Sequence, residues 1–146
     1  MFSGRPEQKI LEWREFRNQL GDWPADITTV ARAWARAPLS NIYLAYDDYS
    51  KWPDAWMLIN DGIYCDISVA LGMFYTLYYS SYEQKDSMKI ECYRLRDRHQ
   101  ILNLVNLEQG KYMLNWNVGE PVNILSLGAL PTPMYTITAQ DLPIKK

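Results

Sequence analysis

Apolar side chains recur at helical spacing across the middle of the chain, from Asp66 onward, which predicts a helix with one face against a core. The positions that carry the pattern are Ile67, Ala70, Leu71, Phe74, Leu77 and Tyr78. Gly62 breaks the chain ahead of this helix, so Cys65 falls in the first turn. Backbone N–H groups there have no partner within the helix and the helix dipole is positive, which favours a thiolate. Cys65 is therefore a candidate nucleophile; the alternative is a buried packing residue.

Two amphipathic helices are expected nearer the N-terminus. The first opens at Pro6 and its apolar stripe extends to Leu20, and the second runs through Trp34 and stops before Pro38. We expect these two helices to form a helical hairpin. The next segments are predicted to be a long ordered loop over 39–53, with an extended piece at 42–44, and then a short helix over 54–60.

Beyond the central helix the pattern changes from helical to alternating, which predicts strands. The expected strands span residues 88–93, 99–107, 111–117, 123–127 and 134–138. The second has apolar residues on both faces, which is typical of a central strand. A charged turn over 94–98 and a turn at 108–110 make the first three strands antiparallel. In the third strand, alternation groups Tyr112, Leu114 and Trp116 on one face and Met113, Asn115 and Asn117 on the other.

Helices followed by antiparallel strands predict an α+β fold, with the N-terminal helices and the cysteine-bearing helix packed on an antiparallel sheet. We expect a single domain over 1–146, with a helical part over 1–59 and a helix plus antiparallel strands over 60–146.

Composition argues against several classes of function. The net charge of -2 gives no basic surface for nucleic acid. From the N-terminal residues we expect no signal peptide, and the chain has no apolar run of about 18 residues, so we expect no membrane association and a cytoplasmic location. Two cysteines and a single histidine at irregular spacing argue against a zinc site, and no cofactor is expected. The 11 tyrosines and 6 tryptophans are typical of interfaces and hint at a subunit or binder, with an oligomer as one possibility; the alternative is an ordinary aromatic core.

A thiol nucleophile needs a base, and the single histidine of the chain is His99. It follows Cys65 by 34 residues and opens the predicted central strand. If Cys65 is catalytic, His99 must be its partner. The alternative is a solvated imidazole that caps the charged turn before it.

Three stretches of the chain together resemble a known family: Gly62-Ile-Tyr-Cys65-Asp-Ile-Ser-Val-Ala-Leu, His99-Gln-Ile-Leu-Asn-Leu-Val and Gly110-Lys-Tyr-Met-Leu-Asn115-Trp-Asn-Val-Gly. Their order, spacing and element type over residues 60–120 resemble the transglutaminase-like superfamily, which is related to papain. In that family a cysteine opens a helix after a glycine, a histidine opens a central strand, and Asp or Asn lies on the next strand. The resemblance implies the fold of that family and a Cys-His-Asn site.

The third residue of this site remains open between two asparagines. Asn115 matches the family spacing, 16 residues after His99, where the family usually carries Asp. An amide orients an imidazole but cannot stabilise imidazolium as a carboxylate does. In a regular hairpin Asn117 lies nearer His99, whereas Asn115 faces Asn103, unless a bulge shifts the register. The alternative for both asparagines is a solvent-facing amide near a turn.

An oxyanion would need donors beside the thiol. The backbone N–H of Cys65 is one, and an indole N–H of Trp52 or Trp56 is a second candidate, the alternative for each tryptophan being a place in the core.

Two functions follow from these observations. The first is a thiol acyl-transfer enzyme, either an amide or peptide hydrolase or a transglutaminase-type transferase, that acts on a protein or peptide substrate. The second is a catalytically inert module of the same fold. The small size, aromatic content and proline-rich tail resemble tailed-phage proteins. That resemblance implies a virion or tail/baseplate assembly protein, with other viral structural proteins as partners, in the host cytoplasm or incorporated in a virion.

Overall fold

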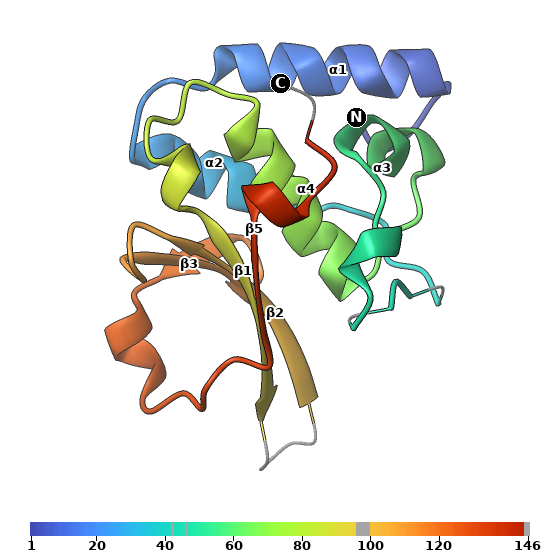
Figure 1. Ribbon diagram of the computed structural model, residues 1–146. Helices are drawn as coiled ribbons and strands as arrows, with labels where there is room; N and C mark the ends of the chain where they lie inside the picture. The colour runs from blue at the N-terminus through green and yellow to red at the C-terminus, as the bar shows by residue number, and fades with distance from the viewer. Residues whose placement is uncertain (42, 46, 96–99, 145–146) are drawn as a thin grey trace.

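The computed structural model describes residues 1–41, 43–45, 47–95 and 100–144. A layer of helices covers one face of an antiparallel sheet (Figure 1), which confirms the predicted α+β class. The helices are α1 (Pro6–Gln19), α2 (Ala25–Trp34), α3 (Ala55–Asp61) and α4 (Asp66–Tyr78). The strands are β1 (Lys89–Leu95), β2 (Gln100–Leu107), β3 (Tyr112–Asn117), β4 (Glu120–Val122) and β5 (Tyr135–Thr138). Short 3₁₀ turns lie at Tyr49–Lys51, Lys85–Ser87, Ile124–Leu127 and Ala139–Asp141.

The strands follow the order β4-β3-β2-β1-β5, and every neighbouring pair is antiparallel. β2 is the central strand, as its apolar residues on both faces predicted. One face of the sheet joins the main core under the helices through Val105 and Leu107. The other face forms a smaller cluster around Leu104, which side chains from residues 122–130 cover. α4 lies against the first of these two faces. The candidate site therefore includes the β2 residues whose side chains point toward α4.

α4 is the centre of the fold, and its residues from Ile67 to Leu77 are all buried. The sequence predicted a single buried stripe. The helix is enclosed more fully because α2 and α3 pack on it in addition to the sheet. Gly72 makes the close approach of α2 possible, since a Cβ at this position would overlap the Trp34 ring.

The predicted hairpin of the first two helices is wrong, because α1 packs mainly on α3 and α2 packs on α4. Instead, Thr76 of α4 ties both helices to the centre. The indole Nε1 atoms of Trp13 and Trp34 donate to its Oγ1 at 3.0 and 2.9 Å, and this hydroxyl donates to Gly72 O at 2.6 Å. A hydroxyl has one proton and two lone pairs, so this group is fully satisfied. Trp13, Trp34 and Thr76 are each at most 1% exposed.

Candidate functional site

Cys65 is the N-cap residue of α4. α3 ends at Gly62, whose left-handed conformation (φ 64°) stops the helix and redirects the chain toward Cys65. A parallel bridge between Leu39 and Tyr64 holds this segment, and Ser40 N donates to Tyr64 O at 2.8 Å. The start of α4 is thus fixed by a segment distant in sequence, and Cys65 is only 3% exposed.

The Cys65 sulfur has two polar neighbours. Leu44 N donates to Sγ at 3.4 Å, and Ser68 Oγ lies 3.1 Å from Sγ. Cys65 N also donates to Ser68 Oγ at 3.1 Å, which leaves the serine proton free to point at the sulfur. With that orientation two donors converge on Sγ, as the charged form of a thiol requires. The backbone N–H of Cys65, an expected oxyanion donor, is taken by Ser68 in this state.

His99 lies outside the described residues. The first described residue of β2 is Gln100, which pairs with Leu95, and the polar residue that β2 directs at the start of α4 is Asn103. Asn103 N and Nδ2 donate to Asp66 Oδ2 at 3.3 and 2.9 Å. Asn103 is 3% exposed, and its Oδ1 has no hydrogen-bond partner among the described residues.

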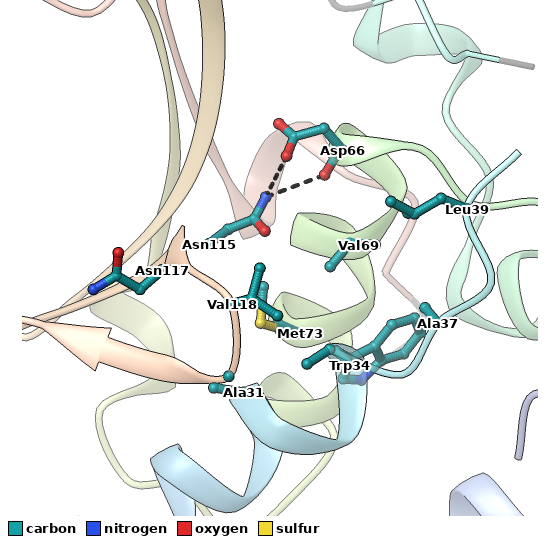
Figure 2. A pocket seen from close by; sticks show the side chains of 12 residues that line it. Ala31, Trp34, Ala37, Leu39, Asp66, Val69, Met73, Asn115, Asn117 and Val118 are labelled. Atoms are coloured by element: carbon teal, nitrogen blue, oxygen red, sulfur yellow. Dashed lines mark hydrogen bonds between the residues drawn. The ribbon is translucent and has the colours of Figure 1, made fainter. Parts of the chain in front are cut away.

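Asn115 is the predicted site residue that reaches the start of α4. Its Nδ2 donates to Asp66 Oδ1 at 3.0 Å and to Asn103 O at 2.9 Å, with Asp66 O at 3.3 Å (Figure 2). Its backbone is left-handed (φ 73°), a conformation that Asn tolerates better than most residues, and the β3–β4 register shifts around it. Such a bulge re-aims a side chain, and here it directs the amide at α4.

The bulge also corrects the predicted faces of β3. Trp116 packs with Met113 in the outer cluster, whereas Leu114 belongs to the core under the helices. The extra residue at Asn115 breaks the alternation, so Trp116 does not share a face with Leu114. Asn117, at the end of β3, is exposed, and its side chain points away from Asp66 (Figure 2). The choice between the two asparagines as the orienter of an imidazole stays a prediction.

Asp66 is the charged group at the centre of this network. Partial burial raises its pKa above the ordinary value, and the hydrogen bonds from Asn103 and Asn115 act in the opposite direction. The second cysteine, Cys92, lies opposite Asn103 on β1. Burial, and then the Asp66 carboxylate, raise the pKa of the Cys92 thiol to about 11. This cysteine therefore has the inert character of a packing residue.

A cavity of about 180 Å³ opens beside the network (Figure 2). Asp66 and Asn115 stand at one end of it, and the rest of its wall is largely apolar, formed by Ala31, Trp34, Ala37, Val69, Met73 and Val118.

The two tryptophans proposed for the oxyanion have other contacts. Trp52 Nε1 donates to Ala45 O at 2.8 Å, so an oxyanion role would require its single N–H to leave that carbonyl. Trp56 packs edge-on against Trp13 and Tyr79, on the side of α1. Their role in catalysis stays a prediction.

The structure adds Asp66, Asn103 and Ser68 to the candidate residues. Asn103 carried a signal in the sequence, as a polar residue within the apolar run of a central strand. Ser68 also carried one, because the third residue after an N-cap is where a side chain returns to the cap.

No protein-family model matches this chain, and no curated protein matches its sequence. Solved structures do match. Three structures of LapG from Legionella pneumophila, titled as EGTA-treated, as LapG alone and as calcium-bound, superpose with TM-scores of 0.71, 0.70 and 0.69. Each is 18% identical and covers 94% of this chain, which spans 76% of the first and 78% of the other two. At this identity the likeness shows the fold alone, and it confirms the predicted transglutaminase-like fold.

None of the described helices has the length and apolar character to span a membrane. Within the described ranges, no three His, Cys, Asp or Glu side chains gather as a metal site would require.

Proposed function

We propose that this protein is a cysteine-dependent enzyme that cleaves or transfers an amide of a peptide or protein substrate, with Cys65 as the nucleophile. The observation that carries the proposal is the placement of Cys65 Sγ at the start of the central helix of a transglutaminase-like fold, where it accepts from the Leu44 N–H and lies 3.1 Å from Ser68 Oγ. Backbone dipoles at a helix start and donors on sulfur favour the nucleophilic thiolate.

The reaction would proceed through a thioester. The Cys65 thiol proton passes to a base, for which His99 is the candidate, and Sγ bonds to the amide carbon. The C–N bond then breaks, and the leaving nitrogen takes the proton from the base. Water or a second amine adds to the thioester carbon and releases the thiol. Asn115, or Asn117, would hold the base in the required tautomer.

Cys65 is 3% exposed, so the groups that cover Sγ must shift locally to admit a substrate. A local shift of Sγ that breaks its contact with the Leu44 N–H would free this donor at the place where an oxyanion forms. The Leu44 backbone is therefore a candidate oxyanion donor in addition to those from the sequence.

The test is the rate of alkylation by iodoacetamide against pH, read by mass spectrometry for each cysteine. We expect Cys65 to react well below pH 7, and we expect this reactivity to be lost in His99→Ala. Cys92 is the internal control, since its pKa of about 11 keeps it a thiol across this range. If Cys65 is protected, or behaves the same with and without His99, the enzymatic proposal is wrong.

A second candidate is a catalytically inert module of this fold. The observation that favours it is the closed network of Asp66, Asn103 and Asn115 over the helix start, with Cys65 covered. Sedimentation analysis of the wild-type chain tests it, because an assembly module should form a stable oligomer or bind a partner. The tailed-phage role remains a prediction from resemblance.

A further inference from the structure

Two hollows lie at the start of α4. The first is the cavity of about 180 Å³ beside Asp66, with Trp34, Val69 and Met73 in its wall. Leu39 and Val118 also line it and are 72% and 85% exposed.

The second hollow has a volume of about 150 Å³ and lies on the side of Leu44. Its wall is formed mainly by Tyr43, Leu44, Pro53, Leu58 and Ile63, with Ser68 facing α4. Both residues that contact Cys65 Sγ, Leu44 and Ser68, therefore line this second hollow.

Residues beside Cys65 line both hollows. Ser68, whose Oγ lies 3.1 Å from Cys65 Sγ, is in the wall of the second hollow, and Asp66 and Val69 are in the wall of the first. Ser68 and Val69 are consecutive residues of α4 and so diverge by about 100° around the helix axis. The two hollows therefore lie on different sides of the start of α4, next to Cys65.

An extended peptide has the matching geometry, because successive side chains point to opposite sides of the backbone. When its scissile amide lies over Cys65, the side chains on either side of that amide point in opposite directions. We propose that the two hollows are the specificity subsites of the enzyme, and that its substrate is an extended peptide with a branched aliphatic residue on each side of the amide attacked. This inference rests on the proposed function.

The chemistry of the hollows selects the class of side chain. Both walls are mainly apolar, so a charged side chain would lose hydration without a partner. Asp66 lines the first hollow and Asp61 lines the second, and each carboxylate would repel a negatively charged substrate side chain. Asp66 is already engaged by Asn103 and Asn115 and so offers little to a cation.

The volumes set the size. A dry apolar cavity of about 150 Å³ holds a benzene molecule, so each hollow accepts a side chain as large as that of Leu or Ile. Glycine or alanine would leave most of either hollow unfilled.

The test uses labelled hexapeptides and fluorescence anisotropy with the full-length Cys65→Ala protein, which binds without cleaving. The central pair of the peptides is Leu-Leu, Leu-Gly, Gly-Leu, Gly-Gly or Asp-Asp. We expect Leu-Leu to bind at least about tenfold more tightly than Gly-Gly, and Asp-Asp to bind more weakly still.

Matched variants in the same background assign the hollows. Ala35 lines the first hollow and is exposed, so Ala35→Phe should fill it and weaken only one of the Leu-Gly and Gly-Leu peptides, by about tenfold. Ala35→Ser changes the same position without filling it and should not. Ile63→Ala should weaken the other peptide. Leu125→Ala, an exposed aliphatic position that lines neither hollow, is the control for truncation.

Equal binding of Leu-Leu and Gly-Gly, or no binding of Leu-Leu below about 1 mM, overturns the inference even when Cys65 proves reactive toward iodoacetamide. Side-chain-selective binding with an unreactive Cys65 refutes the enzymatic function instead, and leaves the hollows as peptide-binding sites. Circular dichroism of each variant confirms that a loss of binding is not a loss of fold.

Discussion

Replacing Thr76 with valine should destabilise the fold far more than the loss of one hydroxyl suggests. Valine has nearly the shape of threonine, so the packing around α4 is kept. The hydroxyl, however, is the acceptor for Trp13 Nε1 and Trp34 Nε1, and all three side chains are buried. The substitution leaves two buried indole N–H groups without a partner.

The magnitude follows from that count. A buried donor that loses its acceptor costs about 1–3 kcal/mol, so the two indoles together cost about 2–6 kcal/mol. The donated bond from Thr76 to Gly72 O adds little, because that carbonyl still accepts within the helix. We expect a loss of about 3 kcal/mol in the free energy of unfolding, which lowers Tm by roughly 10 °C for a chain of this size.

Urea denaturation followed by tryptophan fluorescence measures the loss, read as a lower midpoint at unchanged m-value. Thr76→Ser is the matched control: it keeps the hydroxyl and should cost about 1 kcal/mol for the missing methyl. In a double-mutant cycle, Trp13→Phe should cost less in the Thr76→Val background than in wild type, because the donor is already orphaned. A Thr76→Val protein within about 1 kcal/mol of wild type would refute the anchoring role of this hydroxyl.

Three further predictions concern the site and its support. Gly72→Ala should lower the free energy of unfolding, measured by urea denaturation, by about 1–3 kcal/mol or more, because the added Cβ would overlap the Trp34 ring. Asn115→Ala should lower the free energy of unfolding by about 2 kcal/mol, because it loses the hydrogen bonds to Asp66 and strains the left-handed backbone. Asn115→Gly loses the same hydrogen bonds but avoids the strain, so it should lower the free energy of unfolding by less. Since the folded-state pKa of Asp66 is raised, its contribution to stability is present below its ordinary pKa of about 3.9 and is lost as the pH rises through the raised value. We therefore expect the urea midpoint of Asp66→Asn to increase relative to that of wild type as the pH rises from 3 to 7. Midpoint curves of the two proteins that run parallel over this range would contradict the prediction.

Features with a local cause followed from the sequence. Asp54 caps α3 by accepting from Met57 N, Gly62 ends that helix in a left-handed conformation, and residues 108–110 turn the hairpin with three positive φ angles. The period of apolar residues fixed α4 and the central strand in the same way. Each of these depends on neighbours within a few residues, so the pattern alone carried the information.

The use of the aromatic residues is decided in three dimensions. Their abundance suggested an interface, which stays a prediction, and Trp13, Trp34 and Trp52 are buried in the core of this chain. Trp13 and Trp34 share one acceptor on a helix 63 and 42 residues away. Composition records how many rings there are but not what they face.

The sequence by itself determined the α+β class, the order of the elements and the position of Cys65 at the start of a buried helix, since these follow from periodicity and helix-terminus chemistry. Only the tertiary structure decided what surrounds that cysteine. The amide of Asn115, at the bulge, bonds to Asp66, 49 residues away, and the Leu44 N–H from a loop donates to Cys65 Sγ. Contacts between segments far apart in the chain leave no period in the sequence, and they set the site.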